Sequence, residues 1–251
     1  PTYYRPWNAK PFLSFEQRID TVLTWLQKPE EERPGLVMLY FEEPDGSGHH
    51  NGPRSSQTGA VVQRMDSLMG VLRKKIETLP FAGDVNLIVT SDHGMTDISA
   101  ERVVNINDYL KPEWCEVVDG RTPTSIFSKP EYRDSIYNTL KKATHINVWK
   151  KEEIPAELHY GSSDRIGDIV VAPELGWQFT DVARDTKGAH GYFPQSPDMQ
   201  VMFRAIGPDF KTGYTAKGFV NVDIYPLLSY LLQIVPEKTD GQFERIRDIL
   251  R

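Results

Sequence analysis

Residues 36 to 49 read LVMLYFEEPDGSGH, and residues 87 to 94 read LIVTSDHG. Each stretch is an apolar run that ends abruptly in a carboxylate and an imidazole, which indicates a buried strand followed by a polar loop. Open α/β sheets hold their ligand sites at the edge where such strands end. The two stretches therefore predict an α/β fold with a site at that edge.

The chain between the two predicted strands has the pattern of an amphipathic helix. Pro53 suits a first helical turn, and apolar residues then recur at three- and four-residue steps up to Leu79. Strand, helix and strand together predict a βαβ unit, in which the two strands are parallel. Both Asp/His pairs are then expected at one edge of one sheet.

The whole chain has the size and composition of a single α/β domain portion. It has 251 residues, of which 39% are hydrophobic and 25% are charged, so a well-buried core is expected. The predicted fold class is a three-layer α/β/α sandwich with a largely parallel sheet, and residues 97 to 187 form a loop-rich elaboration over the sheet edge. Other elements are expected from local patterns: helices at 14–28, 131–142 and 223–232, and strands at 103–110, 125–128, 146–149, 168–172 and 201–206.

Charge and cysteine content narrow the function. The formal net charge of −6 argues against nucleic-acid binding through a broad basic surface. Cys115 is the only cysteine, so neither an internal disulfide nor a thiolate metal cluster is expected. No apolar run reaches the roughly 20 residues that a membrane span needs. A small phosphate-bearing substrate is compatible with this composition, because bound cations can reverse the local field.

Aspartate and histidine recur in glycine-flanked loops. Asp45 and His49 lie four residues apart in a loop with two glycines, and Asp92 and His93 follow the second strand. His190 lies between glycines in the segment KGAHGY. Carboxylates combined with imidazoles suit zinc and other borderline divalent ions. We therefore expect these residues to form a metal site.

Several neighbouring residues have alternative interpretations. His50 could replace His49 as a ligand. Glu42 and Glu43 could support the ligands or could simply end a solvated strand. Lys187 could contact a substrate phosphate, although a solvent-facing loop lysine is the commoner case. The histidines expected at the surface are His145 and His159.

The combined motifs resemble the nucleotide pyrophosphatase/phosphodiesterase family, within the alkaline phosphatase superfamily. The resemblance runs from the opening PTYYRPWN, through EEPDGSGH and SDHGM, to HGY and GPDFK. It implies two zinc ions about 4 Å apart. One is held by residues matching Asp45, His49 and His190. The other is held by residues matching Asp92 and His93, together with an aspartate and a threonine nucleophile from farther upstream.

The resemblance also sets expectations for the rest of the protein. No part of this chain matches the upstream segment, so we expect an N-terminal part of the same domain to precede it and to supply the threonine. The implied activity is hydrolysis of a phosphodiester or pyrophosphate, foremost in nucleotides, through a phosphorylated threonine. Trp7 falls where the family stacks its substrate, with Tyr4 as the second choice, although Trp7 could also anchor a loop. The family further implies a periplasmic or extracellular location.

Two other classes of function stay open. A phosphomonoesterase or lipid-directed phosphodiesterase of the same superfamily would share the ligands and differ in the pocket. Alternatively, the chain is a non-catalytic metal-binding fragment, because one ion lacks half its ligands. Hydrolysis rates on matched monoesters and diesters distinguish the other superfamily enzymes from a nucleotide phosphodiesterase. Assays with and without the upstream segment test whether the chain is a non-catalytic fragment.

Overall fold

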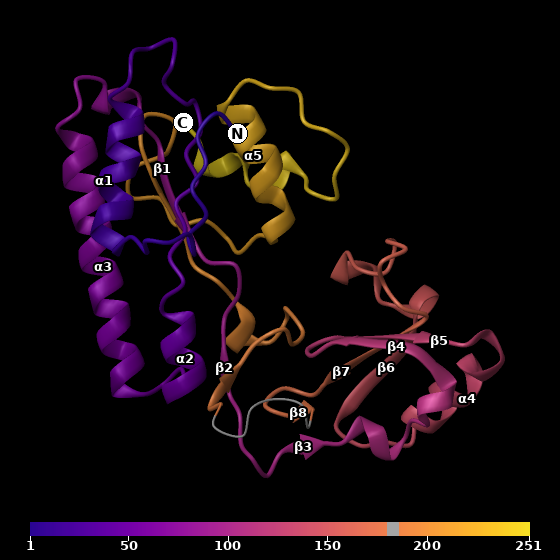
Figure 1. Ribbon diagram of the computed structural model, residues 1–251. Helices are drawn as coiled ribbons and strands as arrows, with labels where there is room; N and C mark the ends of the chain where they lie inside the picture. The colour runs from indigo at the N-terminus through magenta and orange to yellow at the C-terminus, as the bar shows by residue number, and fades with distance from the viewer. Residues whose placement is uncertain (180–185) are drawn as a thin grey trace. The chain divides into compact units, whose positions relative to one another are not determined.

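The computed structural model describes residues 1–179 and 186–251, which form two compact units (Figure 1). Unit 1 comprises residues 1–42, 63–90 and 202–251, and unit 2 comprises residues 43–62 and 91–201. Each unit therefore draws its core from stretches that are far apart in the sequence.

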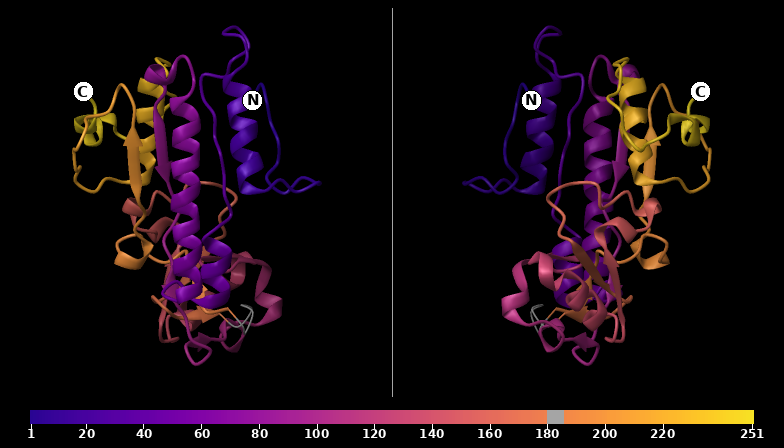
Figure 2. Two further views of the ribbon diagram at one scale, coloured as in Figure 1. Left: turned by 90° about the vertical axis from the view of Figure 1, so that its left-hand side faces the viewer. Right: turned by 90° about the vertical axis from the view of Figure 1, so that its right-hand side faces the viewer.

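Unit 1 has helices on both faces of a two-stranded antiparallel sheet (Figure 1). Leu87 of β1 packs into the cluster beneath α1 and α3, whereas its neighbour Ile88 packs into the cluster beside α5. Successive side chains of a strand point to opposite faces, so this alternation separates two helical layers. Figure 2 shows α1 and α3 side by side. The elements are α1 (Phe15–Leu26), α3 (Ser56–Glu77, from residue 63 on), β1 (Leu87–Thr90), β10 (Phe203–Ile206) and α5 (Ile224–Leu231).

The capping box expected before α1 is present. The Ser14 hydroxyl accepts a hydrogen bond from the Gln17 N–H at 3.2 Å, and the Gln17 side chain accepts one from the Ser14 N–H at 2.9 Å. Ile19 and Leu23 then face the core, where they meet leucines of α3. Both predicted helices are therefore confirmed, with α3 spanning 22 residues.

The strand predicted over residues 36–41 is wrong for this structure, because these residues belong to no strand. Phe41 packs beneath α1 and α3, whereas Leu36, Met38 and Tyr40 are 45%, 84% and 49% exposed. The stretch thus keeps the alternating faces of a strand. It forms no ladder with the described residues, and β1 pairs instead with β10.

Unit 2 is built on a four-stranded antiparallel sheet in the order β4-β5-β7-β6. Ile136 and Leu140 of α4 are fully buried against it, together with Ile126 of β5 and Val171 of β7. The elements are α2 (Asp45–Asn51), β2 (Thr96–Asp97), β3 (Val103–Val104), β4 (Cys115–Gly120), β5 (Thr124–Ser128), α4 (Arg133–Leu140), β6 (Ile146–Lys150), β7 (Ile169–Pro173), β8 (Gln178–Phe179) and β9 (Gly188–Ala189).

Two short ladders complete unit 2. Strand β2 pairs antiparallel with β9, and β3 pairs parallel with β8.

Short 3₁₀ helices occupy both units, at Ala82–Asp84, Ile106–Asp108, Pro112–Trp114, Pro130–Tyr132, Lys151–Glu153, Ala156–Leu158, Pro197–Met199, Asn221–Asp223, Phe243–Arg245 and Arg247–Ile249.

The strand directions differ from the expected largely parallel sheet. Among the described residues, β3 with β8 is the single parallel ladder. The physical reason is that strand direction depends on partners distant in the sequence: β1 meets β10 more than a hundred residues later. The α/β class and the order of three layers are as predicted. Within the same described residues, no helix combines the length and the apolar character needed to cross a membrane.

Candidate metal centre

Helix α2 presents Asp45 and His49 on one face, because residues four apart in a helix are neighbours. The sequence predicted a loop here, and the structure forms a seven-residue helix from Asp45 to Asn51. The Glu43 carboxylate accepts a hydrogen bond from the backbone N–H of Ser47 at 3.0 Å, which satisfies one free donor of the first turn. Glu43 therefore supports the helix that carries two of the candidate ligands.

A close backbone contact fixes α2 against the segments that carry the other candidates. A Cβ atom at Gly48 would lie 2.5 Å from Met95 Sδ, and one at Gly188 would lie 2.5 Å from the Gly48 carbonyl oxygen. The contact at Gly188 is with backbone, so this approach requires glycine there, whereas at Gly48 the neighbour is the flexible end of the Met95 side chain. Met95 lies two residues after His93, and Gly188 lies two residues before His190. The contact thus sets the relative positions of three ligand segments.

Hydrogen bonds orient two of the imidazole rings. His49 Nδ1 lies 2.7 Å from the carbonyl oxygen of Gly188, and the His49 carbonyl oxygen accepts a hydrogen bond from the Lys187 N–H at 2.7 Å. Similarly, His93 Nδ1 lies 2.9 Å from the carbonyl oxygen of Gly94. Because a carbonyl oxygen only accepts, each Nδ1 carries the proton and each Nε2 keeps its lone pair. The Nε2 atoms are therefore the ones available to an ion.

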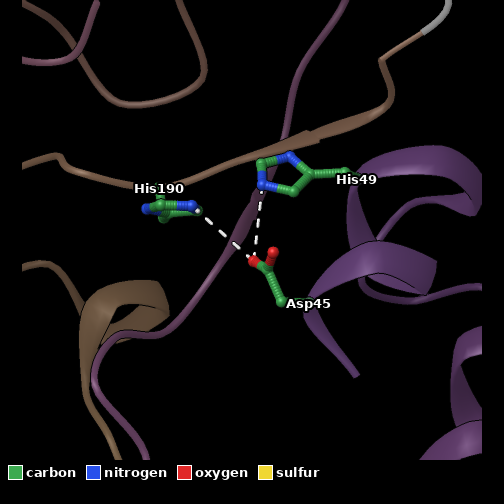
Figure 3. Close-up of side chains that lie close together, drawn as sticks. All are labelled: Asp45, His49 and His190. Carbon is green, nitrogen blue, oxygen red and sulfur yellow. Dashed lines mark ion pairs between the residues drawn. The ribbon is translucent and has the colours of Figure 1, made fainter. Parts of the chain in front are cut away.

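Three imidazole nitrogens surround one oxygen of Asp45. Its Oδ1 lies 3.4 Å from Nε2 of His49 and 3.6 Å from Nε2 of His190. The Nε2 atom of His93 is 3.8 Å away. Figure 3 shows His49 and His190 approaching Asp45 from separate chain segments. Asp45 Oδ1 is buried and has no hydrogen-bond partner among the described residues.

This arrangement fits a divalent cation. Two atoms that each bind a tetrahedral zinc ion at about 2.0 to 2.1 Å lie about 3.4 Å apart, close to the spacing around Asp45 Oδ1. A buried carboxylate oxygen without a donor is costly, and a cation would satisfy it. Within residues 1–179 and 186–251, Asp45, His49 and His190 are the one group of at least three such side chains close enough to share an ion.

Asp92 and His93 lie beside this group. Asp92 Oδ1 accepts a hydrogen bond from the His93 backbone N–H at 3.1 Å and is 3.6 Å from His93 Nε2. The Asp92 side chain is 71% exposed, so one face of it is open to a further ligand or to solvent. Their assignment to a second ion stays a prediction.

The surroundings of His190 favour its neutral form. Burial, followed by the nearby His93, lowers the pKa of His190 below its usual value of 6.5. The His93 and His190 rings stack with their centroids 3.5 Å apart and an angle of 13° between planes. Protonating both rings would place two like charges in contact. Metal binding requires the neutral form, which this environment favours at neutral pH.

The alternative candidates lie elsewhere. His50 is exposed on α2, and Lys187 is exposed with its backbone bound to His49. Glu42 forms a two-pronged ion pair with Arg18, at 2.5 and 3.0 Å. His145 stacks on Trp177 with ring centroids 3.7 Å apart. The remaining histidine, His159, is an exposed residue with a left-handed backbone.

The predicted substrate-stacking residues belong to unit 1. Trp7 is 50% exposed and contacts Tyr40 edge-on, with ring centroids 5.8 Å apart. Tyr4 is 76% exposed. Exposed rings are available for stacking, and their role in binding substrate stays a prediction.

Sequence reasoning missed the residues that position the ligands. Gly188 and Met95 make the close contact with Gly48, and the glycines in KGAHGY were the signal for it. Thr58, at the start of α3, bonds to Ser47 between the two α2 ligands. No sequence pattern singled out Thr58, because its partners become neighbours only when α2 folds back on α3.

Helical layers around a sheet, with Asp45 and His49 on helix α2 and His190 after strand β9, are typical of an α/β protein of the alkaline phosphatase type. Residues 1–193 match the family described as Type I phosphodiesterase / nucleotide pyrophosphatase. The chain belongs to this family.

Individual relatives agree with this membership. The chain is 34% identical over 253 residues to ectonucleotide pyrophosphatase/phosphodiesterase family member 5 of Homo sapiens, covering 100% of this chain and 52% of the relative. It is 35% identical over 253 residues to bis(5'-adenosyl)-triphosphatase of Bos taurus, covering 100% of this chain and 55% of the relative. The chain thus spans about half the length of the curated relatives it matches.

A solved structure is similar throughout the chain. Murine ectonucleotide pyrophosphatase / phosphodiesterase 5, as an inactive variant with a threonine replaced by alanine and in complex with AMP, matches with a TM-score of 0.91. Its identity is 35%, and the match covers 100% of this chain and 67% of that one. The fold of this chain is therefore that of an alkaline phosphatase-like protein.

Proposed function

We propose that the complete protein hydrolyses phosphodiester or pyrophosphate bonds, foremost in nucleotides, at a centre of two zinc ions. The observation that carries this proposal is the buried Asp45 Oδ1, which has no hydrogen-bond donor within residues 1–179 and 186–251 and is surrounded by three imidazole nitrogens. The names of the relatives support the reaction, and the AMP complex of the murine relative supports a nucleotide.

Each candidate ligand has a role that its surroundings support. Asp45, His49 and His190 would hold one ion, and Asp92 with His93 would provide part of the second site. Divalent ions held there would stabilise the negative charge that develops on a phosphoryl group during transfer. The Gly188 carbonyl oxygen fixes the His49 ring so that Nε2 faces Asp45. Trp7, with Tyr4 as the second choice, would stack on the substrate.

The nucleophile in this proposal is a threonine from a segment upstream of residue 1. The inactive threonine-to-alanine variant of the murine relative supports a threonine. Within this chain, the hydroxyl of Thr58 donates to Gly52 O, and that of Thr96 donates to Asp198, so both are engaged in structural bonds. The exposed side chains of Leu36 and Met38 suit a position beside further strands or helices of the same domain.

The same relatives bear on the alternatives and on location. Their names favour diester and pyrophosphate substrates over a phosphomonoester, and the prefix ecto supports a site of action outside the cytoplasm. A role as a non-catalytic metal-binding fragment applies only to these 251 residues without their upstream segment.

The test uses the complete protein carrying His49→Ala, with His50→Ala as the matched control on the same helix. Zinc content is measured together with hydrolysis of bis(4-nitrophenyl) phosphate and 4-nitrophenyl phosphate. The wild type and His50→Ala should hold zinc and prefer the diester. His49→Ala should lose about one equivalent of zinc and most turnover, because one of three ligands to that ion is gone. A wild-type preference for the monoester, or full zinc content in His49→Ala, would overturn the proposal.

A further inference from the structure

A buried hydroxyl network connects α2 to the start of α3. The Ser47 and Thr58 hydroxyl oxygens lie 3.1 Å apart, and both side chains are buried. The Thr58 hydroxyl also lies 2.8 Å from the carbonyl oxygen of Gly52 and 3.0 Å from the Ser55 hydroxyl. Asn51 Nδ2 donates to the Ser47 hydroxyl at 3.1 Å. The network thus reaches both ends of the loop between the helices.

Counting protons gives the bonds of Thr58 to Gly52 and Ser47 a direction. A carbonyl oxygen only accepts, so the single Thr58 hydroxyl proton goes to Gly52. Thr58 Oγ1 then accepts from Ser47. The Ser55 hydroxyl has one proton, which faces both Thr58 Oγ1 at 3.0 Å and the Gly52 carbonyl oxygen at 2.9 Å. The Ser47 oxygen in turn accepts from Asn51. The Thr58 hydroxyl contacts Gly52, Ser47 and Ser55 at once, which makes Thr58 the centre of the network.

Helix α2 depends on such contacts for its shape. It has seven residues, two of them glycine, and isolated helices shorter than about 12 residues are marginal in water. Its conformation, and hence the placing of Asp45 relative to His49, must come from contacts with the rest of unit 2. Ser47 lies between these two ligands in the sequence and is the residue that Thr58 contacts.

We propose that Thr58 is a positioning residue for the metal centre: through Ser47 it sets the geometry of Asp45 and His49 without touching an ion or a substrate. This inference rests on the metal centre of the proposed function. Metal sites tolerate deviations of only about 0.2 Å in ligand distance, so a small shift of α2 should weaken metal binding. Removing partners that orient metal ligands typically costs about 10- to 100-fold in affinity.

The test compares Thr58→Val, which keeps the shape and removes the hydroxyl, with Thr58→Ser, which keeps the hydroxyl. In Thr58→Val the Gly52 carbonyl oxygen retains the Ser55 hydroxyl at 2.9 Å, which favours a folded variant. The zinc dissociation constant is measured by chelator competition on the complete protein. Thr58→Val should weaken zinc binding about 10- to 100-fold, and Thr58→Ser should restore most of it. Thr24→Val, which removes a hydroxyl bonded within α1, should leave zinc binding unchanged.

Two further measurements separate positioning from general stability. The melting temperature of the metal-free protein should fall alike in Thr58→Val and Ser47→Ala, while the histidine NMR signals of His49 shift and those of His145 do not. The double variant should lose little more zinc affinity than either single one, because both act through one bond. Lower melting with an unchanged zinc constant in the folded protein would overturn the inference. No zinc binding by the wild type would instead remove the proposed function, and the inference with it.

Discussion

Replacing Gly188 by alanine should damage the metal centre although Gly188 is not a ligand. The added Cβ would lie 2.5 Å from the Gly48 carbonyl oxygen and 2.7 Å from Met95 Sδ. Ordinary contact begins at 3.4 Å, so the oxygen must retreat by 3.4 − 2.5 = 0.9 Å. That oxygen is backbone of α2, and the movement would carry Asp45 and His49 with it.

The expected loss of zinc affinity follows from comparing the displacement of α2 with the tolerance of zinc–ligand distances. A shift of several tenths of an ångström exceeds the tolerance of about 0.2 Å in zinc–ligand distances, so zinc affinity should fall by at least about 10-fold. The strained packing should also lower the free energy of unfolding by about 1 to 3 kcal/mol. The assays are chelator competition for zinc and urea denaturation of the metal-free protein.

Gly70→Ala is the matched control. Gly70 lies inside α3, and an added Cβ would meet no atom of another described segment within 4 Å. Alanine there should therefore stabilise the helix by about 0.5 to 1 kcal/mol and leave zinc binding unchanged. Wild-type zinc affinity in Gly188→Ala would refute the role assigned to the contact between α2 and β9.

Three further outcomes are expected. Because folding lowers the pKa of His190 below 6.5, the unfolded chain binds a proton at this imidazole more readily than the folded chain does. The contribution of neutral His190 to the stability of the metal-free protein should therefore be complete above pH 6.5 and decrease below it. The variant His190→Gln should show a weaker dependence of melting temperature on pH. In an active form, Trp7→Ala should raise KM for nucleotides more than for a small aryl diester, because base stacking contributes about 1 to 3 kcal/mol; equal changes would indicate a structural role. The isolated 251-residue chain should bind at most one zinc ion tightly and show little turnover, and brisk hydrolysis by the purified chain would place the nucleophile among its own Ser and Thr residues.

Local patterns in the sequence predicted the elements that depend on neighbouring residues. The capping box at Ser14 and the apolar spacing of α3 involve residues a few positions apart, and both are present. Strand β4 was not predicted, because most of its side chains are exposed and therefore carry no hydrophobic alternation. The sequence predicts a loop where the structure has the helix Asp45–Asn51, since Gly46 and Gly48 disfavour a helix on intrinsic propensity.

The candidate site was more predictable in its residues than in its supports. Asp45, His49 and His190 were singled out by residue type and flanking glycines, and the structure brings them together. The bonds that orient them join distant positions, such as Gly188 to His49, and follow from the tertiary structure alone. The same holds for strand directions, because no local pattern encodes that β1 meets β10.

The distance along the chain between His49 and His190 would give an ion at the proposed centre a mechanical role. They are 190 − 49 = 141 residues apart, and the four-stranded sheet lies wholly between them. An ion bound to both histidines would close that stretch into a ring, as a disulfide between the same two positions would. Closing a long ring lowers the conformational entropy of the unfolded chain. Ion binding to the folded state also stabilises it, increasingly so as the free ion concentration rises above the dissociation constant. Chelation should therefore loosen unit 2 before unit 1, and during synthesis the ring can close only after about three-quarters of these 251 residues have been made.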